Sequence, residues 1–187
     1  MRDLLEELHA EHLYMADVLS VIEAQLALIE SGEPADYELL RDAVYFMTEY
    51  PDLFHHARED LIYRRVFGRH HRNRSLGREL ENAHADLRAL GLAFRYEVED
   101  AVADIMLSRS RLTVQGRSYL DTQRSHMRVE EEDIFPRIAD LLDEQDWRAI
   151  ETALPHVGPV GLREITRRRF RSLHDALHAD SSDGESI

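Results

Sequence analysis

Residues 5–29 have the sequence LEELHAEHLYMADVLSVIEAQLALI, and the spacing of the apolar residues in this stretch decides the fold. Steps of three and four residues alternate along Leu5, Leu8, His12, Met15, Leu19, Ile22, Leu26 and Ile29. This spacing places all of these side chains on one face of an α-helix, as in a helix that packs against others in a bundle. The stretch therefore predicts a helix over about residues 3–30, which ends at Ser31, Gly32 and Pro34.

Three further stretches show the same alternation, over about residues 36–67, 76–105 and 112–143. Pro51 falls inside the first of these and is expected to kink that helix. No stretch of useful length alternates polar and apolar residues with a period of two, so no sheet is expected. Four long helices with short connections predict an all-α fold, arranged as an up-down-up-down four-helix bundle.

The bundle is expected to occupy residues 1–143. Residues 144–179 are expected to form a short C-terminal helical extension packed on the bundle, with a short helix near residues 147–154 and an Arg-rich helix over about residues 162–178. The role of the Arg-rich helix stays open. Residues 180–187 predict a disordered tail.

The composition excludes several classes of function. The formal net charge is −14, all 23 basic residues are Arg, and the chain contains no Cys. Without Cys there is no thiol nucleophile, no iron–sulfur ligation and no disulfide. The acidic balance argues against a nucleic-acid partner, because binding to phosphates requires a positive surface. Apolar runs are short, which argues against a membrane partner, and the expected setting is the cytoplasm.

Six polar side chains stand out because they lie on the apolar faces of the predicted helices. They are His12, His55, Glu59, His84, His126 and Glu130. A buried carboxylate without a compensating charge is costly, so Glu59 and Glu130 require cations near them. Four imidazoles and two carboxylates offer a mixed nitrogen and oxygen site, which suits iron or manganese, with zinc as an alternative.

The spacing of these residues repeats between the two halves of the chain. A lone His is followed, 43 or 42 residues later, by a His-x-x-x-Glu pair, namely His12 before His55 and Glu59, and His84 before His126 and Glu130. The spacing of four residues places imidazole and carboxylate on one face of a helix. Two such pairs facing each other can hold two metal ions.

The position of the turns decides whether the residues of each half lie at one height. A turn near Glu33 places His12 level with its partner on the second helix. In the other half, a turn near Ser108 would offset His84 from His126 by about 9 Å along the helix axes, whereas a turn near Ile105 would remove the offset.

Four stretches of the chain together resemble the hemerythrin-like, HHE cation-binding family. They are LHAEHLYMADVL at residues 8–19, YPDLFHHAREDLIY at 50–63, ELENAHADLRAL at 79–90 and HMRVEEEDIFP at 126–136. The resemblance implies a four-helix bundle around a non-haem di-iron centre. Members of the family bind oxygen or nitric oxide, or store and sense iron.

The resemblance implies a ligand set and a cofactor. The ligands would be His12, His55, His84 and His126, with Glu59 and Glu130 as bridging carboxylates. The cofactor would be two iron ions with an oxide or hydroxide bridge, and manganese or zinc are alternatives. The implied partner is a small diatomic ligand or peroxide, in a sensing, buffering or stress role rather than as a dedicated enzyme. A monomer and a homodimer are both compatible with this role.

The chain departs from the oxygen-carrying members of the family at one position. Those proteins have a second His one turn after the third-helix His, and here that position is Arg88. The coordination position is then open, or filled by water or by a nearby side chain. Glu131 is a rival to Glu130 as ligand, because the carriers use a carboxylate five residues after the fourth-helix His. His56 lies beside the apolar face, where a supporting or surface role is favoured over ligation.

Two alternative functions are weighed against a di-iron binding protein. A ferritin-like oxidase or peroxidase would use Glu-x-x-His pairs, and the spacing from Glu81 to His84 fits one such pair. Matching pairs on the inner faces of the other helices are absent from the sequence. The second alternative is a metal-free helical scaffold that binds a protein partner.

Overall fold

The structure, a computed structural model, describes residues 3–69, 74–103, 109–154 and 168–179. Within these ranges the chain forms helices and short connections and contains no strand, so the predicted all-α class is confirmed. The helices are α1 (Asp3–Ser31), α2 (Tyr37–Tyr50), η1 (Pro51–His55), α3 (His56–Arg69), α4 (Arg74–Val102), α5 (Arg109–Val129), η3 (Glu130–Ile134), α6 (Phe135–Leu141), α7 (Glu144–Ala153) and α9 (Arg171–Ala179).

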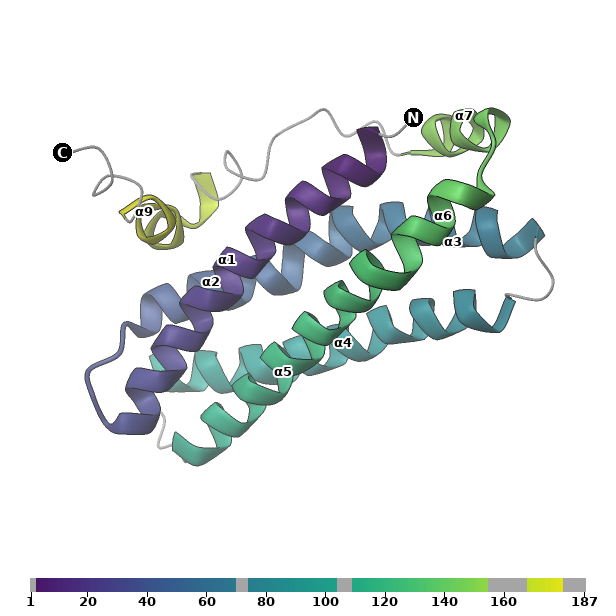
Figure 1. The fold of residues 1–187 in the computed structure, drawn as a ribbon. Coiled ribbons are helices and arrows are strands. Elements are labelled where there is room, and N and C mark those ends of the chain that lie inside the picture. Colours follow the sequence, from purple (N-terminus) through teal and green to yellow (C-terminus); the bar gives the residue numbers. More distant parts are fainter. Residues whose placement is uncertain (1–2, 70–73, 104–108, 155–167, 180–187) are drawn as a thin grey trace.

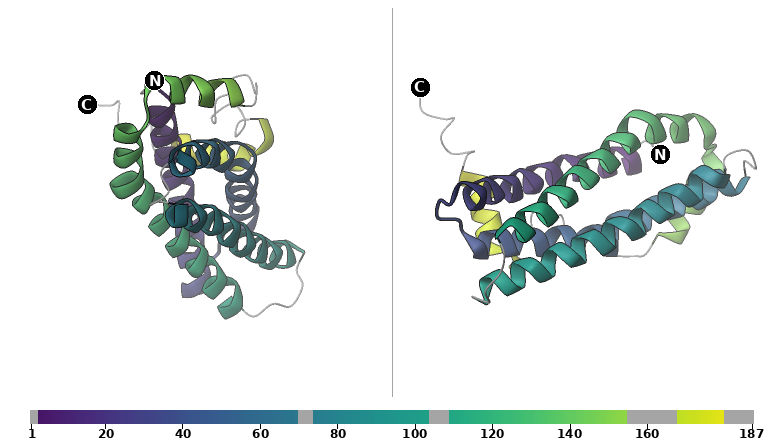
Figure 2. Two further views of the ribbon diagram at one scale, coloured as in Figure 1. Left: turned by 90° about the vertical axis from the view of Figure 1, so that its right-hand side faces the viewer. Right: turned by 90° about the horizontal axis from the view of Figure 1, so that it is seen from below.

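Most of the described residues belong to four long helical segments, which are α1, the continuous run α2–η1–α3, α4, and the continuous run α5–η3–α6. α1 packs against α2 and α5, and α4 packs against the same two helices, so the segments enclose a common interior. Figure 1 shows these segments side by side, and Figure 2 shows them from one end and from below. The ends of the four long predicted helices shift by at most three residues, as at the start of α5.

The C-terminal elements pack on the outside of these segments. α7 contacts α3, and α9 contacts α1 and α2. α7 begins at Glu144, earlier than predicted, because Asp143 caps the helix and forms a reciprocal capping box with Asp146. In the described part of the predicted Arg-rich helix, Phe170 is not helical and α9 begins after it. Residues 162–167 and the predicted tail, 180–187, lie outside the described residues.

The second long segment passes from α to π geometry at its proline. η1 begins at Pro51, and the amide of His56 donates to the carbonyl of Pro51, five residues earlier. Proline has no amide hydrogen for the carbonyl four residues before it, which is that of Met47. The hydroxyl of Tyr119 on α5 donates to this carbonyl instead, at 3.3 Å. The irregularity predicted at Pro51 is therefore a π-helical turn through which the helix continues.

The boundaries of α4 and α5 agree with the earlier of the two predicted turns. α4 ends at Val102 and α5 begins at Arg109, so His84 and His126 lie at nearly equal distances from the connection. Residues 104–108 themselves lie outside the described residues. The two histidines therefore lie at one height, as a turn near Ile105 requires.

α1 is long and apolar enough, by length and composition, to cross a membrane over Leu4–Ser31. By this criterion the prediction that the apolar runs of the chain are short is wrong. The apolar side chains on the inner face of α1 belong to the interior, where Leu19, Ile22 and Leu26 are completely buried. A core helix of a folded domain has the same composition, because one of its faces is packed against its neighbours.

The apolar interior consists of two clusters, and a layer of polar side chains lies between them. On α1, Leu8 belongs to one cluster and Met15 to the other, with His12 between them. His84 on α4 and Glu130 in η3 lie likewise between residues of the two clusters. The polar layer is thus closed off from water by apolar side chains on both sides along the segments.

Candidate metal centre

The structure brings all six predicted ligand residues together in this polar layer. All are buried, and His55, Glu59 and Glu130 have no exposed surface. Each long segment contributes at least one of them, because each carries a polar residue at the same height on its inner face. Their assignment as metal ligands stays a prediction, which the following geometry supports.

Two histidines form one side of the layer. The Nε2 atoms of His12 and His55 lie 2.8 Å apart, and their ring centroids lie 4.6 Å apart. Two nitrogens that bind one ion at about 2.1 Å and at right angles would lie about 3 Å apart. On the other side of the layer, the rings of His84 and His126 have centroids 4.9 Å apart and are nearly perpendicular.

The two carboxylates lie between these histidine pairs. Oε1 of Glu59 lies 3.1 Å from Nε2 of His55, and Oε2 of Glu59 lies 3.4 Å from Nε2 of His84. The two oxygens of Glu130 also lie near histidines of different pairs. Oε2 lies 3.5 Å from Nε2 of His12, and Oε1 lies 3.5 Å from Nε2 of His84. Each carboxylate therefore faces histidines of both halves of the chain, as a bridging ligand must.

Several buried polar atoms of this layer lack a hydrogen-bond partner among the described residues. They are both carboxylate oxygens of Glu59, Oε2 of Glu130, and Nε2 of His56, His84 and His126. Leaving such an atom unpaired in the interior costs about 1–3 kcal/mol. Cations placed among them would bind the nitrogen lone pairs and the carboxylate oxygens alike, so the residues present fit a metal centre.

Candidate ligand atoms of the layer fall into two groups that share one residue. In one group, His12, His55 and Glu59 each offer a ligand atom, and these atoms lie within 4.8 Å of one another. In the other group, His56, Glu59, His84 and His126 do the same. Both groups contain Glu59, so two neighbouring ions would share this carboxylate.

Carboxylates outside the layer contact the opposite nitrogen, Nδ1, of three of the predicted ligand histidines. Nδ1 of His12 lies 2.7 Å from Glu131, Nδ1 of His55 lies 2.8 Å from Glu11, and Nδ1 of His84 lies 3.0 Å from Asp60. A proton on Nδ1 that is donated to a carboxylate leaves the lone pair on Nε2, which faces inward. This arrangement fixes ring orientation and tautomer in metal-binding histidines.

The sequence did not indicate most of these supporting carboxylates. Glu11 and Asp60 each adjoin a predicted ligand, and Asp52 lies four residues before His56, so spacing was the only signal for them. Glu131, the rival ligand, lies outside the inner group, where it accepts hydrogen bonds from His12 and from the exposed His9. Its carboxylate, which is partly exposed, therefore contacts two histidines of α1 and does not face the inner ligand atoms.

Tyr63 is a further residue of the layer that the sequence did not indicate. Its hydroxyl donates to Oε1 of Glu130 at 2.7 Å, and the side chain is 1% exposed. Burial, with the charges of Glu59 and Glu130, raises the pKa of Tyr63 well above its usual value. The phenol therefore keeps its proton and can hold the Glu130 carboxylate in place.

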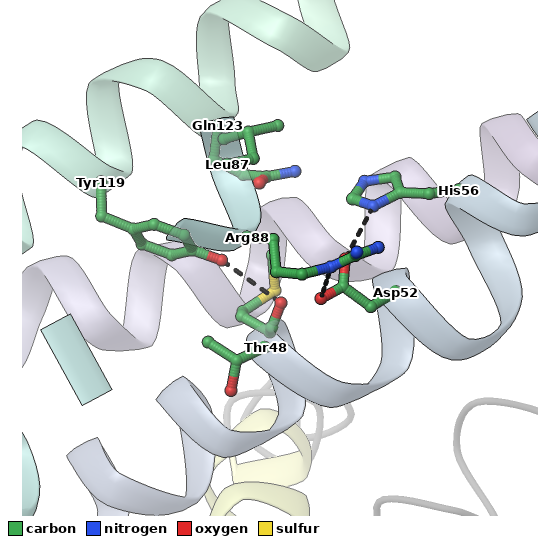
Figure 3. A pocket seen from close by; sticks show the side chains of 8 residues that line it. Thr48, Asp52, His56, Leu87, Arg88, Tyr119 and Gln123 are labelled. Carbon is green, nitrogen blue, oxygen red and sulfur yellow. Dashed lines mark hydrogen bonds and ion pairs between the residues drawn. The ribbon is translucent and has the colours of Figure 1, made fainter. Parts of the chain in front are cut away.

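His56 is buried, so of the supporting and surface roles expected from the sequence the surface role is wrong. It lies on the part of α3 that faces α4, and its ring stacks on that of His84 with centroids 4.2 Å apart. Its Nδ1 lies 3.3 Å from Asp52, and Asp52 also accepts a hydrogen bond from Arg88 at 2.9 Å. Figure 3 shows His56 and Arg88 both directed at Asp52, beside a cavity of about 10 Å³, the size of one water molecule.

Without a bound ion, His55 and Glu59 form a buried ion pair. Burial alone would lower the pKa of His55, but the charge of Glu59 and the hydrogen bond to Glu11 raise this pKa to about 9. Burial would raise the pKa of Glu59, yet the neighbouring imidazolium holds it well below its usual range. At neutral pH the metal-free protein therefore carries a proton on His55.

The two histidines on the other side differ in protonation. Burial lowers the pKa of His84, but the hydrogen bond to Asp60 and the nearby carboxylates of Glu130 and Glu59 raise it to about 11. Burial lowers the pKa of His126 to about 4, so this imidazole is neutral at pH 7. A metal ion would have to displace the proton of His84 but none from His126.

Comparisons with known proteins agree with this geometry. The family model described as "Hemerythrin HHE cation binding domain" matches residues 3–138, which include every residue of the polar layer. Searches among curated proteins and among solved structures found no match.

Proposed function

Because the chain belongs to the hemerythrin HHE cation-binding domain family, we propose that it is a non-haem di-iron protein. In this proposal the four long segments form the up-down-up-down bundle expected from the sequence. One iron ion is held by His12 and His55, and the other by His84 and His126. Glu59 and Glu130 bridge the two ions. Manganese or zinc can occupy the same donor set, since it mixes imidazole and carboxylate ligands.

One observation supports this function most directly. Two completely buried carboxylates lie between two pairs of histidines, and three of their four oxygens have no hydrogen-bond partner among the described residues. A pair of divalent cations would offset the buried negative charge and pair these oxygens at once. Surface ion pairs would not need the apolar clusters that close the layer on both sides.

The surrounding residues orient the donor atoms of the proposed centre and keep bulk water away from it. Glu131, Glu11 and Asp60 each hold Nδ1 of a ligand histidine, and Tyr63 holds Glu130, so the donor atoms are oriented before an ion arrives. The apolar clusters exclude bulk water from the layer. When bound, iron would supply a change of oxidation state and coordination positions for a small ligand.

The proposed ligand is a diatomic molecule or peroxide, or iron itself is the species that is sensed or buffered. The cavity beside His56 is of the size of one water molecule, which suits small ligands rather than organic substrates. We propose a cytoplasmic protein, monomeric or homodimeric, without nucleic-acid or membrane partners, as its acidic charge favours.

The ferritin-like alternative has no support in the position of Glu81. The carboxylate of this residue binds Arg64 at 2.8 Å, at the surface and apart from the polar layer. The spacing between Glu81 and His84 therefore does not bring both side chains to one centre.

Reconstitution with iron tests the proposed function. We expect about two iron ions per chain by elemental analysis and a near-ultraviolet charge-transfer absorption. A His12→Ala/His84→Ala variant removes one donor from each pair, so we expect it to bind less than one ion. The matched control, His174→Ala/His178→Ala, removes two histidines of α9 and should keep the parent stoichiometry. Less than one ion per parent chain, with no absorption, would refute the proposal and favour a metal-free scaffold.

A further inference from the structure

We propose that His56 is a further metal ligand, which binds the ion held by His84 and His126 through its Nε2 atom. The inference rests on the proposed function, since it adds a residue to that centre. It fills the coordination position that Arg88 leaves without a histidine on α4. The ligand then comes from α3, the neighbouring helix, rather than from α4.

The burial and the unpaired nitrogen of His56 are the first observation. His56 is 4% exposed, and its Nε2 atom has no hydrogen-bond partner among the described residues. One ligand atom from each of His56, Glu59, His84 and His126 lies within 4.8 Å of the others. Opposite ligands of one ion, each at about 2.1 Å, lie about 4.2 Å apart, so a contraction of a few tenths of an ångström would suffice in distance. Because the rings of His56 and His84 are stacked, one of them must also rotate to direct its lone pair at the shared ion.

The second observation is that His56 has the same support as the predicted ligands. His12, His55 and His84 each have Nδ1 against a carboxylate, and His56 has its Nδ1 against Asp52. A supporting carboxylate on Nδ1 directs the lone pair of Nε2 toward the metal. His56 therefore has the hydrogen-bond pattern of a metal-binding histidine, with Nδ1 against a carboxylate and Nε2 unpaired. An ordinary buried histidine would have partners for both nitrogens.

Arg88, which stands where the oxygen carriers have a histidine ligand, contacts His56 through Asp52. The guanidinium of Arg88 donates to Oδ2 of Asp52, while Oδ1 of Asp52 faces Nδ1 of His56 (Figure 3). The arginine therefore does not bind the ion but fixes the carboxylate that orients His56. This chain of contacts explains why an arginine at that position is compatible with a complete centre.

Two rival roles for His56 need to be separated from ligation. The ring stacks on His84 with an angle of 12° between the ring planes, so His56 could serve packing alone. A water molecule in the adjoining cavity could also accept or donate a hydrogen bond at Nε2. Packing depends on ring shape, a water contact on any hydrogen-bonding group, and ligation on a donor that binds metal.

Two substitutions distinguish these roles. His56→Gln keeps a hydrogen-bonding group but removes a good metal donor, so we expect one ion to bind with parent affinity and the other at least about 100-fold more weakly. His56→Glu offers a carboxylate, and we expect it to restore binding of the second ion. The readouts are iron per chain, the two dissociation constants, and the number of histidine nitrogens coupled to iron by pulsed electron paramagnetic resonance. His174→Gln on α9 is the matched control.

Parent affinity for both ions in His56→Gln would overturn the inference, as would equal impairment of His56→Gln and His56→Glu, which would indicate packing. If His56→Gln does not fold, Asp52→Asn is tested instead. We expect this variant to bind one ion about 10-fold more weakly, because Asp52 orients His56. Parent affinity for both ions in Asp52→Asn would overturn the inference. The two proposals fail differently. A parent protein that binds less than one ion refutes the di-iron function, whereas two ions bound with the same affinities in parent and His56→Gln refute only the role of His56.

Discussion

At the scale of single residues, the adjacent acids Glu130 and Glu131 have different roles. Glu130 is completely buried and faces the ligand nitrogens, whereas Glu131 accepts a hydrogen bond from Nδ1 of His12. We expect Glu131→Gln to lower iron affinity by about 10–100-fold while two ions still bind, because it weakens the support of one ligand. Glu130→Gln removes a bridging carboxylate and should lower the number of ions bound.

Elemental analysis and iron titration of both variants measure this difference. Glu132→Gln is the matched control, because this neighbouring carboxylate lies at the surface near Arg128, and it should have parent affinity and stoichiometry. The assignment of the ligand to Glu130 would be wrong if Glu131→Gln lost an ion and Glu130→Gln kept both.

The six inner residues were predictable from the sequence because they break an apolar helical pattern at regular intervals. The supporting residues were not, since Glu11, Asp52 and Asp60 lie off that face, where acids are common in any solvated helix. Their role depends on how neighbouring segments approach them. Tyr63 was missed for the opposite reason, because an aromatic residue on an inner face resembles ordinary core packing.

At the scale of the helices, a hydrogen bond joins α5 to the last turn of α2, just before the π-helical turn η1. Pro51 provides no amide hydrogen for the carbonyl of Met47, and the hydroxyl of Tyr119 donates to that carbonyl. We expect Tyr119→Phe to lower the free energy of unfolding by about 1–2 kcal/mol, since it leaves a buried carbonyl unpaired. In a Pro51→Ala background the loss should be smaller, because alanine restores an amide that can serve the same carbonyl.

Urea unfolding of the parent, the two single variants and the double variant measures this coupling. The iron-free proteins are compared, so that changes in metal binding do not contribute. An equal loss from Tyr119→Phe in both backgrounds would show that the hydroxyl does not compensate for the proline.

The long helices were predictable because their apolar spacing extends over many turns. Less regular features were not. The proline indicated an irregularity in the second helix, but its form depends on Tyr119 of another segment. The start of α7 depends on a capping box between Asp143 and Asp146, two acids that periodicity does not single out. The break at Phe170 fits its burial in the core beside Phe46, which an Arg-rich sequence does not predict.

At the scale of the whole molecule, the polar layer makes stability depend on what occupies it. The apolar clusters on both sides keep water out, so the buried carboxylates need protons or cations nearby. In the metal-free protein this charge is supplied by protonated His55 and His84, whose pKa values are raised to about 9 and about 11. Metal ions require both imidazoles to be neutral, so protons and metal compete for the same nitrogens.

This competition predicts opposite pH dependences for the stability of the metal-free protein and for its affinity for iron. A histidine whose pKa is raised on folding stabilises the protein fully below its unfolded pKa of about 6.5, and this contribution is lost as the pH rises through the folded value. The metal-free protein should therefore lose stability between pH 6.5 and 8.5, by at most about 1.4 kcal/mol per pH unit for each proton. The affinity for iron should rise over the same range, because binding releases these protons.

Melting curves with chelator, and anaerobic titrations with ferrous iron at each pH, measure the two trends. Glu59→Gln is an informative variant, because Glu59 is the charge that most raises the pKa of His55, and its loss should flatten the decline of the metal-free protein. A metal-free protein whose stability is constant or rises from pH 6.5 to 8.5 would contradict the proposed protonation of the layer. An iron affinity independent of pH would show that the ions do not bind where these protons are held.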